Sequence, residues 1–340
     1  MTSLKTKNIC FLAAFLFLAI VPTLAKVVNE VEGCDQFLHD ETPPEIPGIL
    51  EDGANKAQNR YKIICQTYGD DPDPKSNQRF LTVYDIVNRV PLFSAYEYKG
   101  SGGKRKDNWM IEPQLESGIN LGDNMMKEDS NINYNNQAIE NDYEGNGVYD
   151  KGHLFPVNHA SDQEQLDSTF TLTNVVPQHY NFNRGRWETM ESDIKTKMDE
   201  QKVKDNKIRC FVVVGAQPSD NNNLNDNNNK PKNKPKNKPN NKPKKEVNIP
   251  KMMWSAFYCT NTVSGAYWDD NADHGKGATM KSGTVQELQD ELGKTLQGFT
   301  VFPQKQPALK RSSSDSQQPQ AGSSKQPRKS RSPSSSAGRS

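Results

Sequence analysis

The hydrophobic residues of this chain gather in short segments that polar residues separate. Several of these segments are rich in β-branched and aromatic residues, as is typical of strands: 61–68, 80–85, 90–98, 169–176 and 252–259. The run at 209–216 is almost continuously apolar, which favours a strand buried in the middle of a sheet. We expect Pro177 to end the strand at 169–176.

Helical spacing is found in two later segments. One carries an apolar residue at every third or fourth position, so one face of a helix should pack against the core: Trp187, Met190, Ile194 and Met198. The other begins with a capping box at Thr284 and continues with a leucine stripe: Leu288, Leu292 and Leu296. Residues 115–147 are polar and rich in Asn, so we expect mainly a long loop there.

The N-terminus, one internal segment and the C-terminus differ in composition from the rest. Residues 1–25 carry Lys5 and Lys7, then an apolar run, then small residues up to Ala25, which predicts a signal peptide cleaved after Ala25. The alternative is a membrane anchor, but the run is shorter than the ~20 apolar residues that span a bilayer. We therefore predict a secreted, extracellular protein with no membrane segment after cleavage.

Two low-complexity segments are predicted to be disordered. Residues 220–245 repeat Lys, Asn and Pro and contain almost no apolar side chain, and residues 304–340 are rich in Ser, Arg and Pro. The strands on both sides of the first segment should belong to one sheet. We therefore expect one folded domain over residues 26–303, with the segment at 220–245 as an insertion.

The charge distribution separates these segments from the body. The net charge of the whole chain is +1, but residues 221–245 carry +7 and residues 310–340 carry +6. With the +2 of the signal peptide removed as well, about −14 remains for the rest of the mature chain. The basic insertion could attract a polyanion that the acidic body repels. It could equally fold back as a solubility device, or be an expanded repeat without function.

Four cysteines remain once the signal peptide and its Cys10 are removed, and three disulfide pairings are possible. We favour Cys34 with Cys65 and Cys210 with Cys259, because each pair closes one segment of chain. A zinc site is less favoured, because no two of the four lie a few residues apart as zinc ligands usually do.

Residues 149–154 (YDKGHL) contain the best-placed histidine. His153 follows a strand-like segment and Gly152, which permits a sharp turn. A histidine can take the proton of an attacking water because its ordinary pKa lies near neutrality. The other histidines lack such a setting and are expected to be surface or structural residues: His39, His159, His179 and His274.

Residues 182–191 add an amide and a carboxylate. The amide oxygen of Asn183, near the start of the predicted helix, could bind a hard cation such as Mg²⁺, which often takes one or two protein ligands. Glu191 would lie about 12 Å further along the helix axis, so it would orient a metal-bound water or pair with Lys195. The alternative is an ordinary helix cap at Asn183 and a solvated carboxylate at Glu191. Together with His153, these groups suit metal-assisted hydrolysis of a phosphodiester.

Three motifs in order resemble one known family. They are 150–154 (DKGHL), 172–178 (LTNVVPQ), and then Asn183, Trp187 and Glu191. They resemble the DNA/RNA non-specific endonucleases with a ββα-metal finger, over residues 60–303. The signal peptide, GCDQF with TPP near the N-terminus, and 169–174 (TFTLTN) resemble, more narrowly, the vertebrate endonuclease domain-containing 1 proteins. The resemblance implies an α+β fold with a central, mainly antiparallel sheet, flanking helices and a ββα-metal finger.

The resemblance also implies the roles of the site residues. His153 is implied as the general base, Asn183 as the ligand of Mg²⁺ (or Mn²⁺ in its place), and Glu191 as a further metal or active-site residue. Lys151 stands where the family usually has Arg, and Lys195 where an Arg is often found. Lysine keeps the charge but loses the two-pronged fork that suits phosphate. The implied catalytic set is His153, Lys151 and Glu191, with weakened activity.

These observations give two functional hypotheses. The first is a secreted, metal-dependent endonuclease that hydrolyses DNA and RNA with little sequence preference. The second is a nuclease fold with weak or no turnover that acts as a secreted nucleic-acid-binding or interaction module. The presence of both His153 and Asn183 favours the enzyme.

Overall fold

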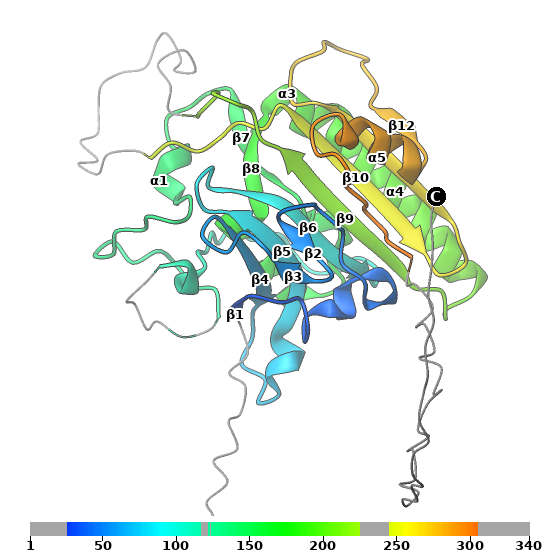
Figure 1. Cartoon of the computed structure of the whole chain (residues 1–340), viewed down its shortest axis with the longest axis horizontal. Helices are drawn as coiled ribbons and strands as arrows, with labels where there is room; N and C mark the ends of the chain where they lie inside the picture. The colour runs from blue at the N-terminus through cyan, green and yellow to red at the C-terminus, as the bar shows by residue number, and fades with distance from the viewer. Residues whose placement is uncertain (1–25, 117–121, 123, 225–244, 305–340) are drawn as a thin grey trace, which may run out of the picture. The chain divides into compact units, whose positions relative to one another are not determined.

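The computed structural model describes residues 26–116, 122, 124–224 and 245–304 (Figure 1). Its main feature is an eight-stranded antiparallel sheet in the order β1-β4-β5-β6-β9-β10-β11-β12. These strands are β1 (Lys26–Val28), β4 (Tyr61–Thr67), β5 (Gln78–Asp85), β6 (Val90–Tyr98), β9 (Cys210–Gln217), β10 (Met252–Cys259), β11 (Ser264–Asp270) and β12 (Lys281–Gly283). The central antiparallel sheet and the α+β class expected from the sequence are confirmed.

Within the described residues, two short ribbons and five α-helices accompany the sheet. The ribbons pair β2 (Leu50–Glu51) with β3 (Ala54–Asn55), and β7 (Tyr149–His153) with β8 (Val175–His179). The helices are α1 (Glu140–Tyr143), α2 (Gln163–Ser168), α3 (Tyr180–Phe182), α4 (Glu188–Lys204) and α5 (Val285–Gly293). A π-helical turn, η7 (Asn183–Trp187), joins α3 to α4. Short 3-10 turns are η1 (Asp35–Phe37), η2 (His39–Glu41), η3 (Pro74–Asn77), η4 (Pro113–Leu115), η5 (Val157–His159) and η6 (Leu172–Asn174).

Both faces of the sheet are buried, each in its own core. Along β9, Val212 and Val214 belong to one core, while Phe211 and Val213 belong to the other. The helical stripe predicted for α4 lies in the first core: Trp187, Met190, Ile194 and Met198. The predicted capping box of α5 is present at Thr284, and Leu288 and Leu292 are buried in the second core. The helix ends at Gly293, so Leu296 follows it and packs against the same core. The continuously apolar sequence of β9 is explained by this burial on both sides.

The strand predicted at 169–176 is wrong in two respects. Its middle forms η6, and β8 then runs from Val175 through Pro177, which lies opposite Lys151 in the ribbon. The side chain of Asn174 donates to the carbonyls of Phe155 and Thr169, and these bonds favour a turn over an extended ladder. A two-stranded ribbon also has free edges, where proline is tolerated.

The predicted loop at 115–147 is mainly irregular but well packed. Tyr134 and Ala138 are buried in the first core, and the Glu116 carboxylate accepts from the backbone N–H groups of Asn135 and Asn136. The segment also contains the short helix α1. Buried loop backbone needs such partners because its polar groups are shielded from water.

The disulfides Cys34–Cys65 and Cys210–Cys259 are present, as favoured from the sequence. The second disulfide joins the paired strands β9 and β10, which flank the insertion. Residues 220–224 still belong to the body, because Leu224 is buried and its N–H donates to the carbonyl of Val247 at 2.8 Å.

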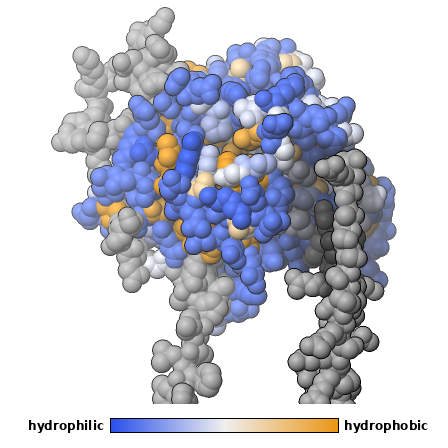
Figure 2. Space-filling model, in the orientation of Figure 1, coloured by the Kyte–Doolittle hydropathy of each residue, from blue (hydrophilic) through white to orange (hydrophobic). Residues whose placement is uncertain are grey.

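The remaining predictions on chain organisation concern segments outside the described residues. The predicted signal peptide (1–25), most of the insertion (225–244) and the tail from 305 lie outside the described residues. No helix in the described part is long and apolar enough to cross a membrane. The face shown in Figure 2 is mostly hydrophilic, with scattered hydrophobic residues.

Candidate active site

The ribbon of β7 and β8 precedes α3, η7 and α4, which gives a ββα arrangement beside the sheet (Figure 1). His153 is the last residue of β7 and pairs with Val175. Gly152 does not make the sharp turn that we expected, because it lies within the strand. A Cβ atom there would lie 2.0 Å from Oε1 of the buried Gln178, so only glycine fits against that side chain.

Asn174 fixes the chain where it leaves His153. Its side-chain oxygen accepts from the N–H of Phe155 at 3.0 Å, and its backbone carbonyl accepts from the N–H of Leu154 at 2.9 Å. Ser94 of β6 also donates to the Asn174 side chain at 2.9 Å. The fully buried Asn174 therefore ties the histidine strand to the central sheet.

A cavity of about 950 Å³ brings the predicted site residues together. His153 and Lys151 of β7, Asn183 of η7 and Glu191 of α4 all line it. Residues separated in the sequence thus face one space, which is the arrangement that the sequence hypothesis requires.

Two aromatic rings hold the His153 imidazole. Trp109 stacks on it at 5.4 Å between ring centroids, and Phe170 meets it edge-on at 4.9 Å. Nε2 is buried and has no hydrogen-bond partner among the described residues. Burial lowers the pKa of His153 to about 3, and the charges of Arg105 and Lys151 act in the same direction. The ring is therefore neutral at pH 7 and able to accept a proton.

Asp150 positions the amide of Asn183. The Asn183 Nδ2 donates to Oδ2 of Asp150 at 3.0 Å, and Arg184 donates to both carboxylate oxygens at 2.8 and 2.5 Å. Since Asp150 can only accept, it fixes the amide with Oδ1 directed away from that contact. Within the described chain no donor is bonded to Asn183 Oδ1, so this oxygen is available as a ligand.

Glu191 is not at the end of a continuous helix that begins at Asn183. The helix is interrupted at Gly185, whose φ of −127° and ψ of −109° are not helical. The offset of about 12 Å expected for an unbroken helix therefore does not apply. The predicted pairing of Glu191 with Lys195 is wrong, because the Lys195 ammonium binds Asp199 at 2.7 Å.

Glu191 lines the cavity and is half-buried. Burial raises the pKa of Glu191 to about 8. The hydrogen bond with Trp187 lowers this pKa, and the negative charge of Glu188 raises it. Behind it, His159 Nε2 lies 2.9 Å from the Glu191 carbonyl oxygen, and its Nδ1 lies 2.7 Å from the Tyr96 hydroxyl. His159 is thus a buried structural residue, as the sequence suggested, and it holds the first turn of α4 against β6.

The side-chain oxygen atoms around the cavity suit a hard cation. The free Oδ1 of Asn183 and the carboxyl of Glu191 are the candidate ligands, and Mg²⁺ accepts such a small protein set. The buried Oδ1 of Asn158 also lacks a partner among the described residues and lines the same cavity. A buried polar atom without a partner is costly, so a bound ion or its water shell would complete this region.

Lys151 lies at the cavity wall with two partners. Its ammonium is 3.3 Å from Oε1 of Glu140 and 4.3 Å from the centre of the Trp109 ring. The same tryptophan therefore supports both the lysine and the histidine of the motif. The sequence reasoning missed Trp109, Asp150 and Asn158. Only Asp150 had a signal, since it stands within the DKGHL motif.

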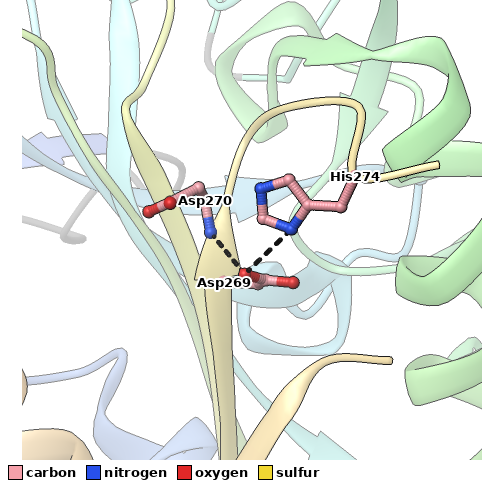
Figure 3. A group of neighbouring side chains, drawn as sticks. All are labelled: Asp269, Asp270 and His274. Carbon is pink, nitrogen blue, oxygen red and sulfur yellow. Dashed lines mark hydrogen bonds and ion pairs between the residues drawn. The ribbon is translucent and has the colours of Figure 1, made fainter. Parts of the chain in front are cut away.

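Asp269, Asp270 and His274 form a separate group whose possible ligand atoms lie within 4.8 Å of one another (Figure 3). The Asp269 carboxylate, however, already accepts from Nε of the buried Arg186 at 2.6 Å. The Arg186 guanidinium occupies the Asp269 carboxylate, and its positive charge repels a metal cation. We therefore interpret the group as an anchor for Arg186 and the end of β11.

The ribbon, the helix and the cavity between them define a ββα type of site. The family model for DNA/RNA non-specific endonucleases matches residues 56–306. The chain therefore belongs to the DNA/RNA non-specific endonuclease family.

Several known proteins are similar to this chain in sequence. The human Endonuclease domain-containing 1 protein is 25% identical over 253 residues, which is 72% of this chain and 42% of that protein. The mouse protein of the same name is 26% identical over 69% of this chain and 40% of its own length. The chain thus spans about two fifths of the length of these relatives. Human mitochondrial Endonuclease G is 38% identical over 123 residues, or 34% of this chain and 35% of that protein.

A crystal structure of the EndoG/EndoGI complex matches with a TM-score of 0.41 and 20% identity, over 63% of this chain and 81% of that chain.

Proposed function

We propose that this chain is a secreted, metal-dependent endonuclease that hydrolyses phosphodiester bonds of DNA and RNA without strong sequence preference. The observation that carries the proposal is the cavity in which His153, Lys151, Asn183 and Glu191 meet. Family membership supplies the substrate class.

In this proposal His153 takes the proton of the attacking water. Its neutral ring is held rigidly by Trp109 and Phe170, so little reorganisation is needed when the proton moves. Lys151 provides positive charge beside the phosphate. Asn183 and Glu191 would hold Mg²⁺, which when bound neutralises charge on the phosphate and its leaving oxygen. Asp150 keeps the Asn183 amide turned for this role.

Secretion is supported by the two disulfides, Cys34–Cys65 and Cys210–Cys259. Disulfides persist in oxidising compartments such as the extracellular space. Expression in animal cells should therefore yield protein in the medium whose N-terminal residue, by mass spectrometry, is Lys26. Retention of the whole product inside the cell would contradict the proposal.

The test of activity is plasmid nicking and RNA cleavage by the purified mature protein. Mg²⁺ should support both reactions, EDTA should stop them, and added Mg²⁺ should restore them. His153→Ala should lower the rate at least about 100-fold, as loss of a general base does, with an unchanged circular dichroism spectrum. Wild-type rates in this variant would exclude His153 as the base.

One observation favours a second candidate, an interaction module with little turnover. Lys151 lacks the two-pronged contact that arginine makes with phosphate. The test measures cleavage and binding by the wild-type protein. If it binds labelled DNA but cleaves neither DNA nor RNA with Mg²⁺ or with Mn²⁺, the second candidate is supported and the first is excluded.

A further inference from the structure

A second cavity of about 850 Å³ lies against a different face of α4 from the candidate active site. Glu188, Glu191 and Lys195 line the first cavity, whereas Thr189 and Asp193 line the second. The side chain that lines both is Arg184. A ligand that passes over Arg184 could therefore occupy both cavities.

Arg184 is held in this position by the catalytic strand. Two of its N–H groups donate to Asp150 at 2.8 and 2.5 Å, yet 69% of the side chain stays exposed. An arginine has five N–H donors, so donors remain for a phosphate. Because Arg184 follows Asn183 directly, their Cα atoms are about 3.8 Å apart. A phosphate bound at Arg184 would thus be close to one held beside Asn183.

The second cavity combines apolar lining with a cationic side chain. The apolar lining comes from Met190 of α4, the Tyr267 ring of β11, and Ala278 and Met280 of the following loop. Lys276 lines the cavity too, and it has no ion-pair partner within the described chain. Such a pairing of apolar surface with positive charge suits a nucleotide, whose base is flat and whose phosphate is anionic.

Both acidic residues of the cavity are held by hydrogen bonds, and the charge of Asp193 is offset by Lys197. Asp193 accepts from the Lys197 ammonium at 2.5 Å and from the Tyr267 hydroxyl. Asp273 accepts from the N–H of Gly275 at 2.8 Å and from the Asn181 amide at 2.8 Å.

The loop that carries Lys276 is fixed to the catalytic segment. Asn181 binds Asp273 at 2.8 Å, and Arg186 Nη2 donates to the Ala272 carbonyl at 2.8 Å. Arg186 is itself held by the buried Asp269. The spacing between Arg184 and Lys276 is therefore set by the fold, as a preformed binding site requires.

We propose that the second cavity binds the nucleotide that lies beyond the neighbouring phosphate, on a strand whose scissile phosphate is beside Asn183, whose next phosphate is at Arg184 and which then reaches Lys276. The inference rests on the proposed nuclease function and adds a subsite to it. A substrate that extends past the scissile bond gains this contact, whereas a dinucleotide does not reach Lys276.

The test compares single-stranded DNA substrates from a dinucleotide to a 12-mer, with the mature protein and Mg²⁺. For the wild type, kcat/KM should rise once the substrate is long enough to fill the second cavity. Lys276→Ala should lower the ratio of long-substrate to dinucleotide kcat/KM about fivefold, as expected for one partly exposed charge contact. It should also reduce the slope of log kcat/KM against log salt for the 12-mer by about one. Ala278→Trp, which fills the cavity without removing charge, should lower the ratio as well.

Lys294→Ala is the matched control, since Lys294 is an exposed lysine of the α5 C-terminus that pairs with Glu291. It should leave the ratio and the salt slope as in the wild type. A wild-type ratio in both Lys276→Ala and Ala278→Trp would overturn the subsite while leaving the nuclease function standing. Failure of the wild-type protein to cleave any substrate would instead overturn the proposed function, and the subsite with it.

Discussion

At the scale of single residues, the surroundings of His153 keep its imidazole ring neutral. Trp109 covers one face of the ring, Phe170 meets its edge, and Arg105 and Lys151 add positive charge. Each of these effects disfavours a charged imidazole. A neutral base is thus ready at physiological pH, although a base of low pKa is a weaker one.

Lys151 is the residue whose replacement should raise activity. Lys151→Arg restores a planar fork that can donate two hydrogen bonds to one phosphate. We expect kcat/KM on plasmid DNA to rise about tenfold, equivalent to ~1.4 kcal/mol of transition-state stabilisation. Steady-state nicking rates at saturating Mg²⁺ would measure this.

The control for Lys151→Arg is Lys62→Arg on β4, whose ammonium donates to the Gln58 carbonyl away from the site. It should have wild-type rates. Equal or lower activity in Lys151→Arg would show that the contacts of this lysine with Glu140 and Trp109 matter more than the fork.

At the scale of elements, one residue, Asp150, links the two segments that form the site. Asp150 of β7 joins the ribbon to η7 through Asn183 and Arg184, which lie 33 and 34 residues later. The amide, the arginine and the histidine strand therefore move as one unit. Groups that orient a metal ligand in this way usually affect metal affinity more than the fold.

Asp150→Asn tests this coupling. The new side chain offers an N–H₂ group where both partners donate, so the Asn183 amide loses its fixed orientation. The Mg²⁺ concentration for half-maximal nicking should rise about 10- to 100-fold, and part of the lost rate should return at high Mg²⁺.

Asp290→Asn on the exposed face of α5 should leave the Mg²⁺ dependence unchanged, because the side chain of Asp290 accepts from Gln286, away from the site. A uniform loss of rate in Asp150→Asn at every Mg²⁺ concentration would show that Asp150 does not act through the metal ligand.

Elements whose signal is local were predictable, and contacts between distant segments were not. The stripe of α4 and the capping box of α5 follow from spacing alone, because burial and capping repeat along the chain. The contact of Trp109 with His153 has no such period, since it joins a polar loop to a strand. Gly185 gives no warning that it breaks the helix, because glycine is compatible with many backbone angles.

At the scale of the whole molecule, the chain that follows the insertion lies near the candidate active site. The N–H of Lys245, the first described residue after it, donates to Asp142 of α1 at 2.9 Å. Glu140 of the same helix contacts Lys151 at 3.3 Å. Lys245 therefore meets the body one short helix away from the catalytic strand, and residues 221–245 carry a net charge of +7 against about −14 for the body.

This position predicts that the insertion contributes to nucleic-acid binding. Residues 225–244 contain seven Lys and one Asp. A short Gly-Ser linker can replace these residues, because Leu224 and Val247 on either side of them are hydrogen-bonded to each other. Each phosphate contact adds about 0.9 to the slope of log binding constant against log salt on duplex DNA. Deletion should therefore flatten this slope by several units in a fluorescence titration of the His153→Ala protein.

A variant with the seven lysines changed to Gln keeps the length of the insertion and separates charge from reach. The slope of this variant should match that of the deletion, because counterion release depends on the charges and not on the chain that carries them. If both variants keep the wild-type slope, the insertion does not bind nucleic acid. A flattened slope in the deletion alone would show that the length of the segment matters and its charge does not.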